Sequence, residues 1–151
     1  MRLRLWRVAV IVAAGATSGL AWNALGGRGF ALGHSVFVQK GDEVIDAAEA
    51  KARLDRGALF LDARPMDFYK MSHVVGALPL PEPDFDRAFA ELEPRLRRNF
   101  NLVLYCAGYG CDASHIVARR LREKGIHAAI LNEGWPAWTE AGYPVKEGGT
   151  P

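Results

Sequence analysis

The chain has only two cysteines among its 151 residues, and its cysteines and histidines show no zinc-finger spacing. A disulfide-stapled mini-protein and a zinc-finger module are therefore excluded. Sixteen glycines and eight prolines follow no period, which excludes a collagen-like chain. The first thirty residues contain four arginines and no acid, whereas the rest carries fifteen basic and seventeen acidic residues. Without a basic face, binding to nucleic acid is not expected.

What is present is typical of an ordinary globular protein. Half of the residues are apolar and 24% are charged, and the length suits one domain with a tail. We expect three parts: an apolar N-terminal segment over residues 1–25, a glycine-rich tether over 26–42, and a domain over 43–148. A short strand is expected within the tether at 35–39.

The segment 1–25 is predicted to be a signal anchor with one transmembrane helix. Residues 8–25 carry no charge, and at about 1.5 Å per residue they approach the ~30 Å thickness of a bilayer core. The preceding arginines should stay in the cytoplasm, which places the domain on the extracytoplasmic (periplasmic) side. Alternatively, residues 8–16 form the core of a signal peptide that is cleaved near 17–19, and the domain is secreted. The arginine cluster disfavours a buried core helix.

From residue 43 onward, helical and strand patterns alternate. Strands are expected at 58–61, 77–80, 102–105 and 127–131, and helices at 46–57, 66–71, 84–98, 112–124 and 135–141. Asp46 is expected to cap the first helix, and Pro94 to kink the third. Pro79 and Pro81 place the second strand at a sheet edge or in a loop. Strands separated by helices imply a parallel sheet, so the sequence predicts a three-layer α/β domain.

Cys106 lies where the strand 102–105 meets the following helix. Ligands of open parallel sheets bind at the carboxyl ends of strands. Backbone N–H groups of a glycine-bearing loop and the start of a helix would favour a thiolate, which is the nucleophilic form of cysteine. Gly108 and Gly110 would let the loop curl around a sulfur or a small anion. Taken alone, however, Cys106 can also be read as a small buried hydrophobe.

Four blocks of sequence, in this order, resemble the rhodanese family. They are LFLDAR at 59–64, HVVGA at 73–77, the Cys106 loop from Tyr105, and EGWPAW at 133–138 followed by AGYPV at 141–145. The resemblance covers roughly residues 44–147 and implies a rhodanese-like α/β fold. Trp135 and Trp138, three positions apart on a helix, are expected in the core rather than at the site.

The resemblance implies a sulfurtransferase. In such enzymes the loop cysteine takes sulfane sulfur from a donor such as thiosulfate or a persulfide, and passes it to cyanide or a thiol. Cys106 would be the catalytic residue, and Arg64 a substrate contact, although an ion pair with Asp62 is favoured. This covalent chemistry needs neither a metal nor an organic cofactor. The residues implied to bind the charged sulfur through their amides are Ala107, Gly108, Tyr109, Gly110 and Cys111.

The sequence departs from the family pattern in two places. The usual Gly-His-Ile-Pro-Gly-Ala reads SHVVGA at 72–77, which keeps His73 but loses a proline and a glycine. Residues 107–114 contain no Lys or Arg, although many family members use one there to recognise anionic donors. Asp112 instead adds negative charge, unless its carboxylate caps the helix. This argues against thiosulfate as the natural donor. His115, within the first helical turn, is expected on the surface.

Three alternatives to a sulfurtransferase follow from the same residues. Related phosphatases and arsenate reductases need a longer loop that ends in arginine, and Asp112 would repel their oxyanions, so phosphatase activity is not expected. Cys111 could pair with Cys106 as a redox partner in an exported thiol–disulfide exchanger, or be an ordinary loop residue. A non-enzymatic binding module is the third, and the presence of Cys106 argues against an inactive copy.

Overall fold

The computed structural model describes residues 6, 12–15, 17, 41–108 and 111–149. The chain divides into two units, Met1–His34 and Ser35–Pro151. In the first, the described residues are helical. Most of the predicted anchor, most of the alternative cleavage region, most of the tether and the strand at 35–39 lie outside the described residues. No helix that the structure describes is both long and apolar enough to span a membrane.

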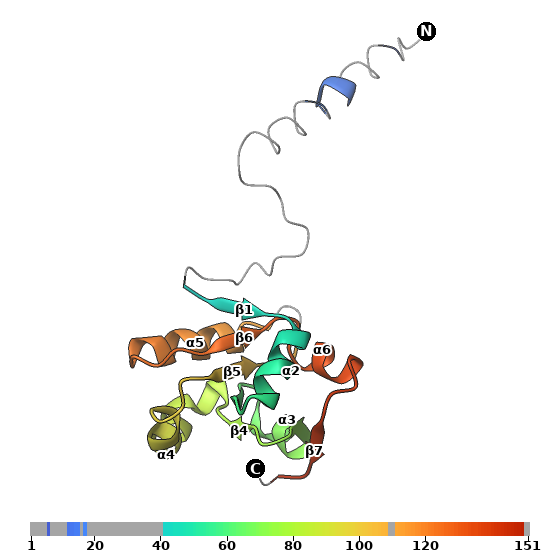
Figure 1. Cartoon of the computed structure of the whole chain (residues 1–151). Coiled ribbons are helices and arrows are strands. Elements are labelled where there is room, and N and C mark those ends of the chain that lie inside the picture. The colour runs from blue at the N-terminus through green and yellow to red at the C-terminus, as the bar shows by residue number, and fades with distance from the viewer. Residues whose placement is uncertain (1–5, 7–11, 16, 18–40, 109–110, 150–151) are drawn as a thin grey trace. The chain divides into compact units, whose positions relative to one another are not determined.

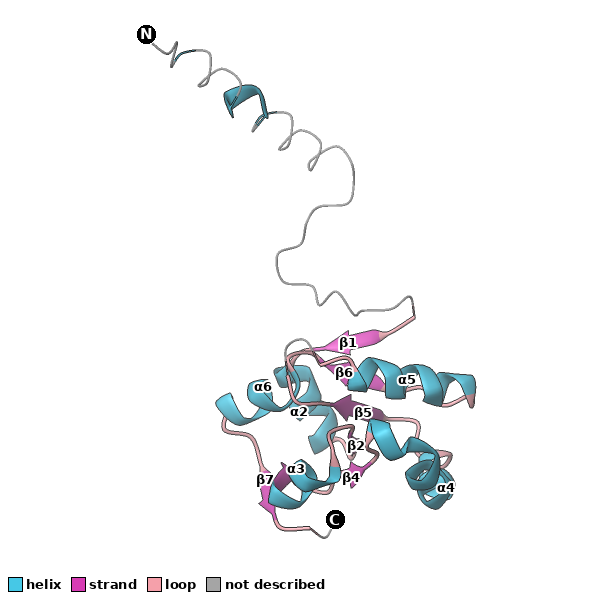
Figure 2. Cartoon of the chain, turned by 180° about the vertical axis from the view of Figure 1, so that it is seen from behind, coloured by secondary structure: helices cyan, strands magenta, loops and turns pink. Residues whose placement is uncertain are grey.

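Within 41–108 and 111–149, five parallel strands form the central sheet in the order β1-β6-β5-β2-β4 (Figure 1 and Figure 2). The strands are β1 (Glu43–Ile45), β2 (Leu59–Asp62), β4 (Leu78–Pro79), β5 (Leu102–Tyr105) and β6 (Ala129–Leu131). In the register of β2 and β5, Asp62 lies beside Tyr105. The carboxyl ends of these two strands are therefore neighbours, which brings the segments after them together.

The helices cover both faces of the sheet. Figure 2 shows α4 and α5 on one face, and α2 and α6 on the other. They are α2 (Ala47–Asp55), α3 (Met66–Met71), α4 (Phe85–Leu96), α5 (Ala113–Glu123) and α6 (Gly134–Glu140), with a 3-10 turn at Glu82–Asp84. Side chains of β5 alternate between the two cores: Leu102 and Leu104 pack in the core with α4 and α5, and Val103 and Tyr105 in the core with α2 and α6. The predicted three-layer α/β fold is confirmed.

Several local predictions are also confirmed. Asp46 caps α2, since its carboxylate accepts a hydrogen bond from the Glu49 amide at 2.8 Å. The strand that ends in prolines, β4, lies at the edge of the sheet. Pro94 lies in the last turn of α4, which continues to Leu96, and the kink expected there stays a prediction.

Three short strands were not predicted. β1 adds an edge to the main sheet, and β3 (Ser72–Val74) pairs antiparallel with β7 (Val145–Glu147) in a separate two-stranded sheet. Each has three residues of mixed polarity, so neither an apolar run nor an alternation long enough to detect marks it.

Candidate active site

Cys106 directly follows β5 and is 3% exposed. Its loop turns immediately: Gly108 has a φ of +132°, and its carbonyl accepts a hydrogen bond from the Cys111 amide at 3.0 Å. Tyr109 and Gly110 lie outside the described residues, and their role at the site stays a prediction. Asp112 is exposed at the start of α5, and its side chain makes no capping hydrogen bond. The carboxylate of Asp112 is therefore not used to cap α5 and lies exposed beside the loop.

The thiol of Cys106 is hydrogen-bonded to two residues that follow it in the chain, Cys111 and Ser114. It donates to the carbonyl of Cys111 at 3.3 Å, and the hydroxyl of Ser114 donates to the sulfur at 3.5 Å. Ser114 is buried in the first turn of α5. Ser114 was not among the predicted site residues, and its only signal in the sequence is its place in the first turn of the helix after the loop. Cys106 and Cys111 are both free thiols.

The hydrogen-bond donors around the sulfur favour the thiolate of Cys106. The Cys111 thiol, which donates a hydrogen bond to that sulfur, lowers the pKa of Cys106 to about 6, against burial, which raises it. The Ser114 hydroxyl and the amides of Gly108 and Ser114 lower this pKa further. The same hydrogen bond and burial raise the pKa of Cys111. At neutral pH, Cys106 is thus present as the thiolate, the nucleophilic form of cysteine, whereas Cys111 remains a protonated donor.

We expect the thiolate of Cys106 to be present above about pH 6 and lost as the pH falls through that value. Ultraviolet absorbance of the thiolate should therefore show a midpoint near pH 6. Cys111→Ala should move the midpoint upward because a donor is lost, whereas Cys111→Ser should keep it low because the hydroxyl still donates. A midpoint in the unmodified chain near the ordinary cysteine value of about 8.5 would contradict this assignment.

The loop that carries Cys106 packs against the start of α6. The Trp135 amide donates to the carbonyl of Cys106 at 2.8 Å. Gly134 has a φ of +58°, and a Cβ there would lie 2.4 Å from that carbonyl oxygen. A Cβ on Gly108 would lie 2.9 Å from the Pro136 side chain. Both positions therefore require glycine, and the contact between the segments fixes the backbone on both sides of the nucleophile's carbonyl.

A buried ion pair supports the site from β2. Arg64 donates through Nε and Nη2 to the carboxylate of Asp62, at 2.9 and 2.7 Å, and through Nη2 to the carbonyl of Ser72. The hydroxyl of Tyr105 also donates to Asp62, at 2.7 Å. Burial, and next the Asp62 charge, raise the pKa of Tyr105, so this hydroxyl stays protonated. The favoured prediction for Arg64, an ion pair with Asp62, is confirmed.

A pocket of about 290 Å³ lies beside the loop. Its lining residues are Arg64, Phe68, Met71, Ser72, Ala107 and Trp135. The Arg64 guanidinium lies over the Trp135 ring, 4.2 Å from its centre. The prediction that both tryptophans belong to the core is confirmed for Trp138, which is fully buried. Trp135 packs against the same core but is only half-buried and also lines this pocket, so its expected absence from the site is wrong. Helical spacing placed both on one face but could not show that α6 begins at the loop.

The prediction that His115 lies on the surface is wrong. Its side chain is buried, and Nδ1 lies 2.8 Å from Oδ2 of Asp42. Arg122 donates to the other carboxylate oxygen of Asp42 at 2.6 Å. Asp42 directly precedes β1. Its carboxylate therefore connects the start of this strand with two residues of α5. No group of three or more metal-ligating side chains occurs among the described residues.

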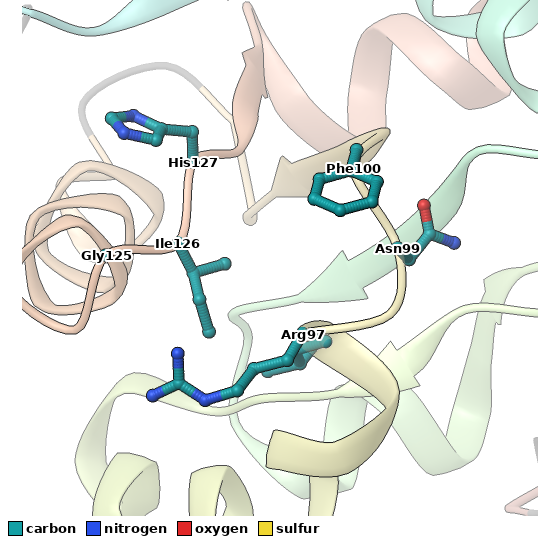
Figure 3. Close-up of a pocket in the computed structure, with 7 residues that line it drawn as sticks. Arg97, Asn99, Phe100, Gly125, Ile126 and His127 are labelled. Atoms are coloured by element: carbon teal, nitrogen blue, oxygen red, sulfur yellow. The ribbon is translucent and has the colours of Figure 1, made fainter.

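A second pocket, of about 350 Å³, lies at the opposite end of the sheet (Figure 3). Arg97 and Phe100 line it from the segment before β5, and Ile126 and His127 from the segment before β6. It therefore lies at the amino ends of these strands, whereas Cys106 lies at a carboxyl end. Parallel α/β sheets bind ligands at carboxyl ends, which favours the smaller pocket beside Cys106 as the substrate site.

Comparison with known proteins agrees with this geometry. Residues 46–141 match the family model described as Rhodanese-like domain. The chain is 32% identical over 108 residues to an HTH-type transcriptional regulator of Mycobacterium tuberculosis, covering 71% of this chain and 46% of the regulator. It is 28% identical over 112 residues to the mitochondrial protein HIGH ARSENIC CONTENT 1 of Arabidopsis thaliana, covering 67% of this chain and 64% of that protein. The chain thus spans less than two thirds of either relative.

Among solved structures, the chain is similar to the thiosulfate sulfurtransferase from Pseudomonas aeruginosa. The two superpose with a TM-score of 0.59 at 30% identity, over 74% of this chain and 21% of that protein. The similarity therefore concerns one part of a much longer enzyme.

Proposed function

The chain belongs to the rhodanese-like domain family, and from that premise we propose that it is a sulfurtransferase that works through a persulfide on Cys106. The observation that carries the proposal is the set of contacts at this sulfur. Cys111, Ser114 and backbone amides hold the pKa of Cys106 at about 6, so a buried thiolate is present at neutral pH. A residue that served only to fill the core would not need these donors.

In the first half-reaction, the Cys106 thiolate attacks the sulfane sulfur of a donor. A Cys106 S–S bond forms, the bond between the sulfane sulfur and the rest of the donor breaks, and the electron pair leaves with that remainder. With thiosulfate the remainder is sulfite. Ser114 and the amides near the sulfur stabilise the negative charge on the persulfide. Arg64 and Asp62 hold the neighbouring strand end and Trp135 in place.

In the second half-reaction, a thiophilic acceptor attacks the outer sulfur of the persulfide. Cyanide leaves as thiocyanate and an organic thiolate leaves as its persulfide, and in both cases the Cys106 thiolate is restored. No external oxidant or reductant enters either step, because the sulfane sulfur keeps its oxidation level. The reaction is covalent catalysis with an electrostatically stabilised nucleophile.

Thiocyanate formation from a sulfane donor and cyanide tests this proposal. The full chain should form thiocyanate with turnover, and Cys106→Ser should reduce the rate to that without protein. Cys111→Ser should retain most of the rate, because a hydroxyl can replace the donor to Cys106. If Cys106→Ser retains the rate, Cys106 is not the sulfur carrier.

The thiol–disulfide alternative would use Cys111 differently. In that mechanism, Cys111 would attack the sulfur of Cys106 in its mixed disulfide with a substrate. Cys111→Ser would therefore abolish thiol–disulfide exchange as completely as Cys106→Ser. The raised pKa of Cys111 disfavours this role, since the protonated thiol is a poor nucleophile. A binding module would instead keep its cellular role in Cys106→Ser.

We also propose that residues 1–25 anchor the chain in a membrane, with residues 43–148 on the extracytoplasmic side. The support is the three arginines within residues 1–7 and the uncharged run 8–25. A bacterial alkaline phosphatase fused after residue 151 should be active and should stay with carbonate-washed membranes. An active fusion in the soluble periplasmic fraction would instead favour the cleaved signal peptide, and an inactive fusion would contradict export.

A further inference from the structure

We propose that the sulfur donor of Cys106 carries an apolar organic group and at most one negative charge, as in an organic persulfide or thiosulfonate. This inference rests on the proposed sulfurtransferase function and names its substrate class. It comes from the walls of the 290 Å³ pocket beside the loop.

The walls of this pocket are mainly apolar. Phe68 and Met71 from α3 line it, together with Ala107 of the loop and Trp135. Phe68 is 52% exposed and Met71 is 71% exposed. Large apolar side chains left in contact with water around a concave site gain free energy when an apolar ligand covers them. Ala107 directly follows Cys106, and the Trp135 amide donates to the Cys106 carbonyl, so two of the lining residues adjoin the backbone of the residue that carries the thiol.

The charges around the pocket do not suit an inorganic dianion. Arg64 is the sole charged residue among the described residues that line it. Its charge is balanced by Asp62, to which Nε and Nη2 are hydrogen-bonded, and its side chain is only 4% exposed. Asp112 adds an exposed carboxylate at the loop. A dianion would lose its hydration without gaining an unpaired cation, whereas a singly charged donor with an apolar body loses less.

A comparison of two thiosulfonates measures the effect of the apolar group alone, because the charge is the same in both. Benzenethiosulfonate and methanethiosulfonate both carry one negative charge and both transfer one sulfur, releasing a sulfinate, so that Cys106–S⁻ becomes Cys106–S–S⁻. Loading rates of the full chain are measured by intact mass and normalised to the rates of the same donors with a small free thiol. We expect a normalised preference for the aromatic donor of about tenfold, and slower loading from thiosulfate than from either.

Two phenylalanines provide a matched pair of variants. Phe68→Ala should bring the preference for the aromatic donor close to one. Phe100→Ala should leave it unchanged, because Phe100 is 96% exposed and lines the other pocket. Met71→Lys should speed loading from thiosulfate by adding an unpaired cation at the rim, and Phe100→Lys should not. Since all three positions are exposed, folding should be preserved, and circular dichroism checks this.

The outcomes separate the two proposals. If thiosulfonates and thiosulfate load Cys106 but the normalised preference is near one, or persists in Phe68→Ala, the apolar-donor inference is wrong and the sulfurtransferase function stands. If thiosulfate loads faster than both thiosulfonates, the inference is also wrong. If no donor loads Cys106, the proposed function fails and this inference fails with it.

Discussion

Gly134→Ala is expected to slow sulfur loading of Cys106 by about 100-fold, the size of loss that follows from displacing a reacting group by about 1 Å. A Cβ at this position would lie 2.4 Å from the carbonyl oxygen of Cys106 and 3.1 Å from the Gly108 nitrogen. Both atoms belong to backbone, so the loop and the start of α6 must separate. The hydrogen bond from the Trp135 amide to Cys106 would then break. The loading rate with a thiosulfonate, measured by intact mass, checks this expectation.

Gly142→Ala is the matched control. Gly142 has a φ of +69°, close to that of Gly134, but no atom lies within 4 Å of a Cβ there. Both variants carry similar backbone strain, of about 1 kcal/mol, and differ in the clash. Gly142→Ala should therefore load at the rate of the unmodified chain. Equal loading rates in the two variants would show that the contact between the loop and α6 does not position the nucleophile.

Arg64→Met is expected to lower the free energy of unfolding by about 3–5 kcal/mol, the cost of leaving one member of a buried ion pair without its partner. The methionine keeps much of the apolar stem but removes the donors to Asp62, which is fully buried. The remaining donors to that carboxylate are the Tyr105 hydroxyl and the Arg64 backbone amide. Urea unfolding monitored by tryptophan fluorescence measures the difference.

Arg87→Met provides the control for this charge effect. Arg87 pairs with Asp84 and Glu91 on the surface of α4, where the side chain is 65% exposed. Its loss should leave the unfolding midpoint nearly unchanged because water solvates the charges left behind. The double variant Asp62→Leu/Arg64→Met should recover part of the stability lost in Arg64→Met. A double variant less stable than Arg64→Met would mean that the buried carboxylate is not the cause.

The sequence predicted the centre of the fold and the place of the nucleophile. β2 and β5 lie inside the sheet, so Leu59–Leu61 and Leu102–Tyr105 are short runs of apolar residues by which the two strands are recognised. Once these are parallel strands, the position of Cys106 after β5 places it at the ligand-binding edge of the sheet. The ion pair of Arg64 with Asp62 was also predictable, because the partners are two residues apart.

Contacts between distant segments could not be predicted. His115 has the pattern of a surface residue on α5, and its burial depends on Asp42, which lies 73 positions away. Trp135 lines the pocket beside the Cys106 loop together with Arg64, which comes from the end of another strand and lies over its ring. Neither Asp42 nor Arg64 changes the pattern of apolar and polar residues around its partner, so the sequence gives no sign of these contacts. The exposed Phe68 and Met71 were likewise assigned only to a short helix, since helical periodicity does not show what lies opposite them.

The most direct test of the account is the intact mass of the full chain before and after exposure to a thiosulfonate. We predict a gain of one sulfur atom per chain, absent in Cys106→Ser, present in Cys111→Ser, and removed by cyanide. A loss of two hydrogens in the unmodified chain, with dissolved oxygen as the oxidant, together with no gain of sulfur in Cys111→Ser, would show a Cys106–Cys111 disulfide instead. That result would contradict a persulfide on Cys106 and assign the pair to thiol–disulfide exchange.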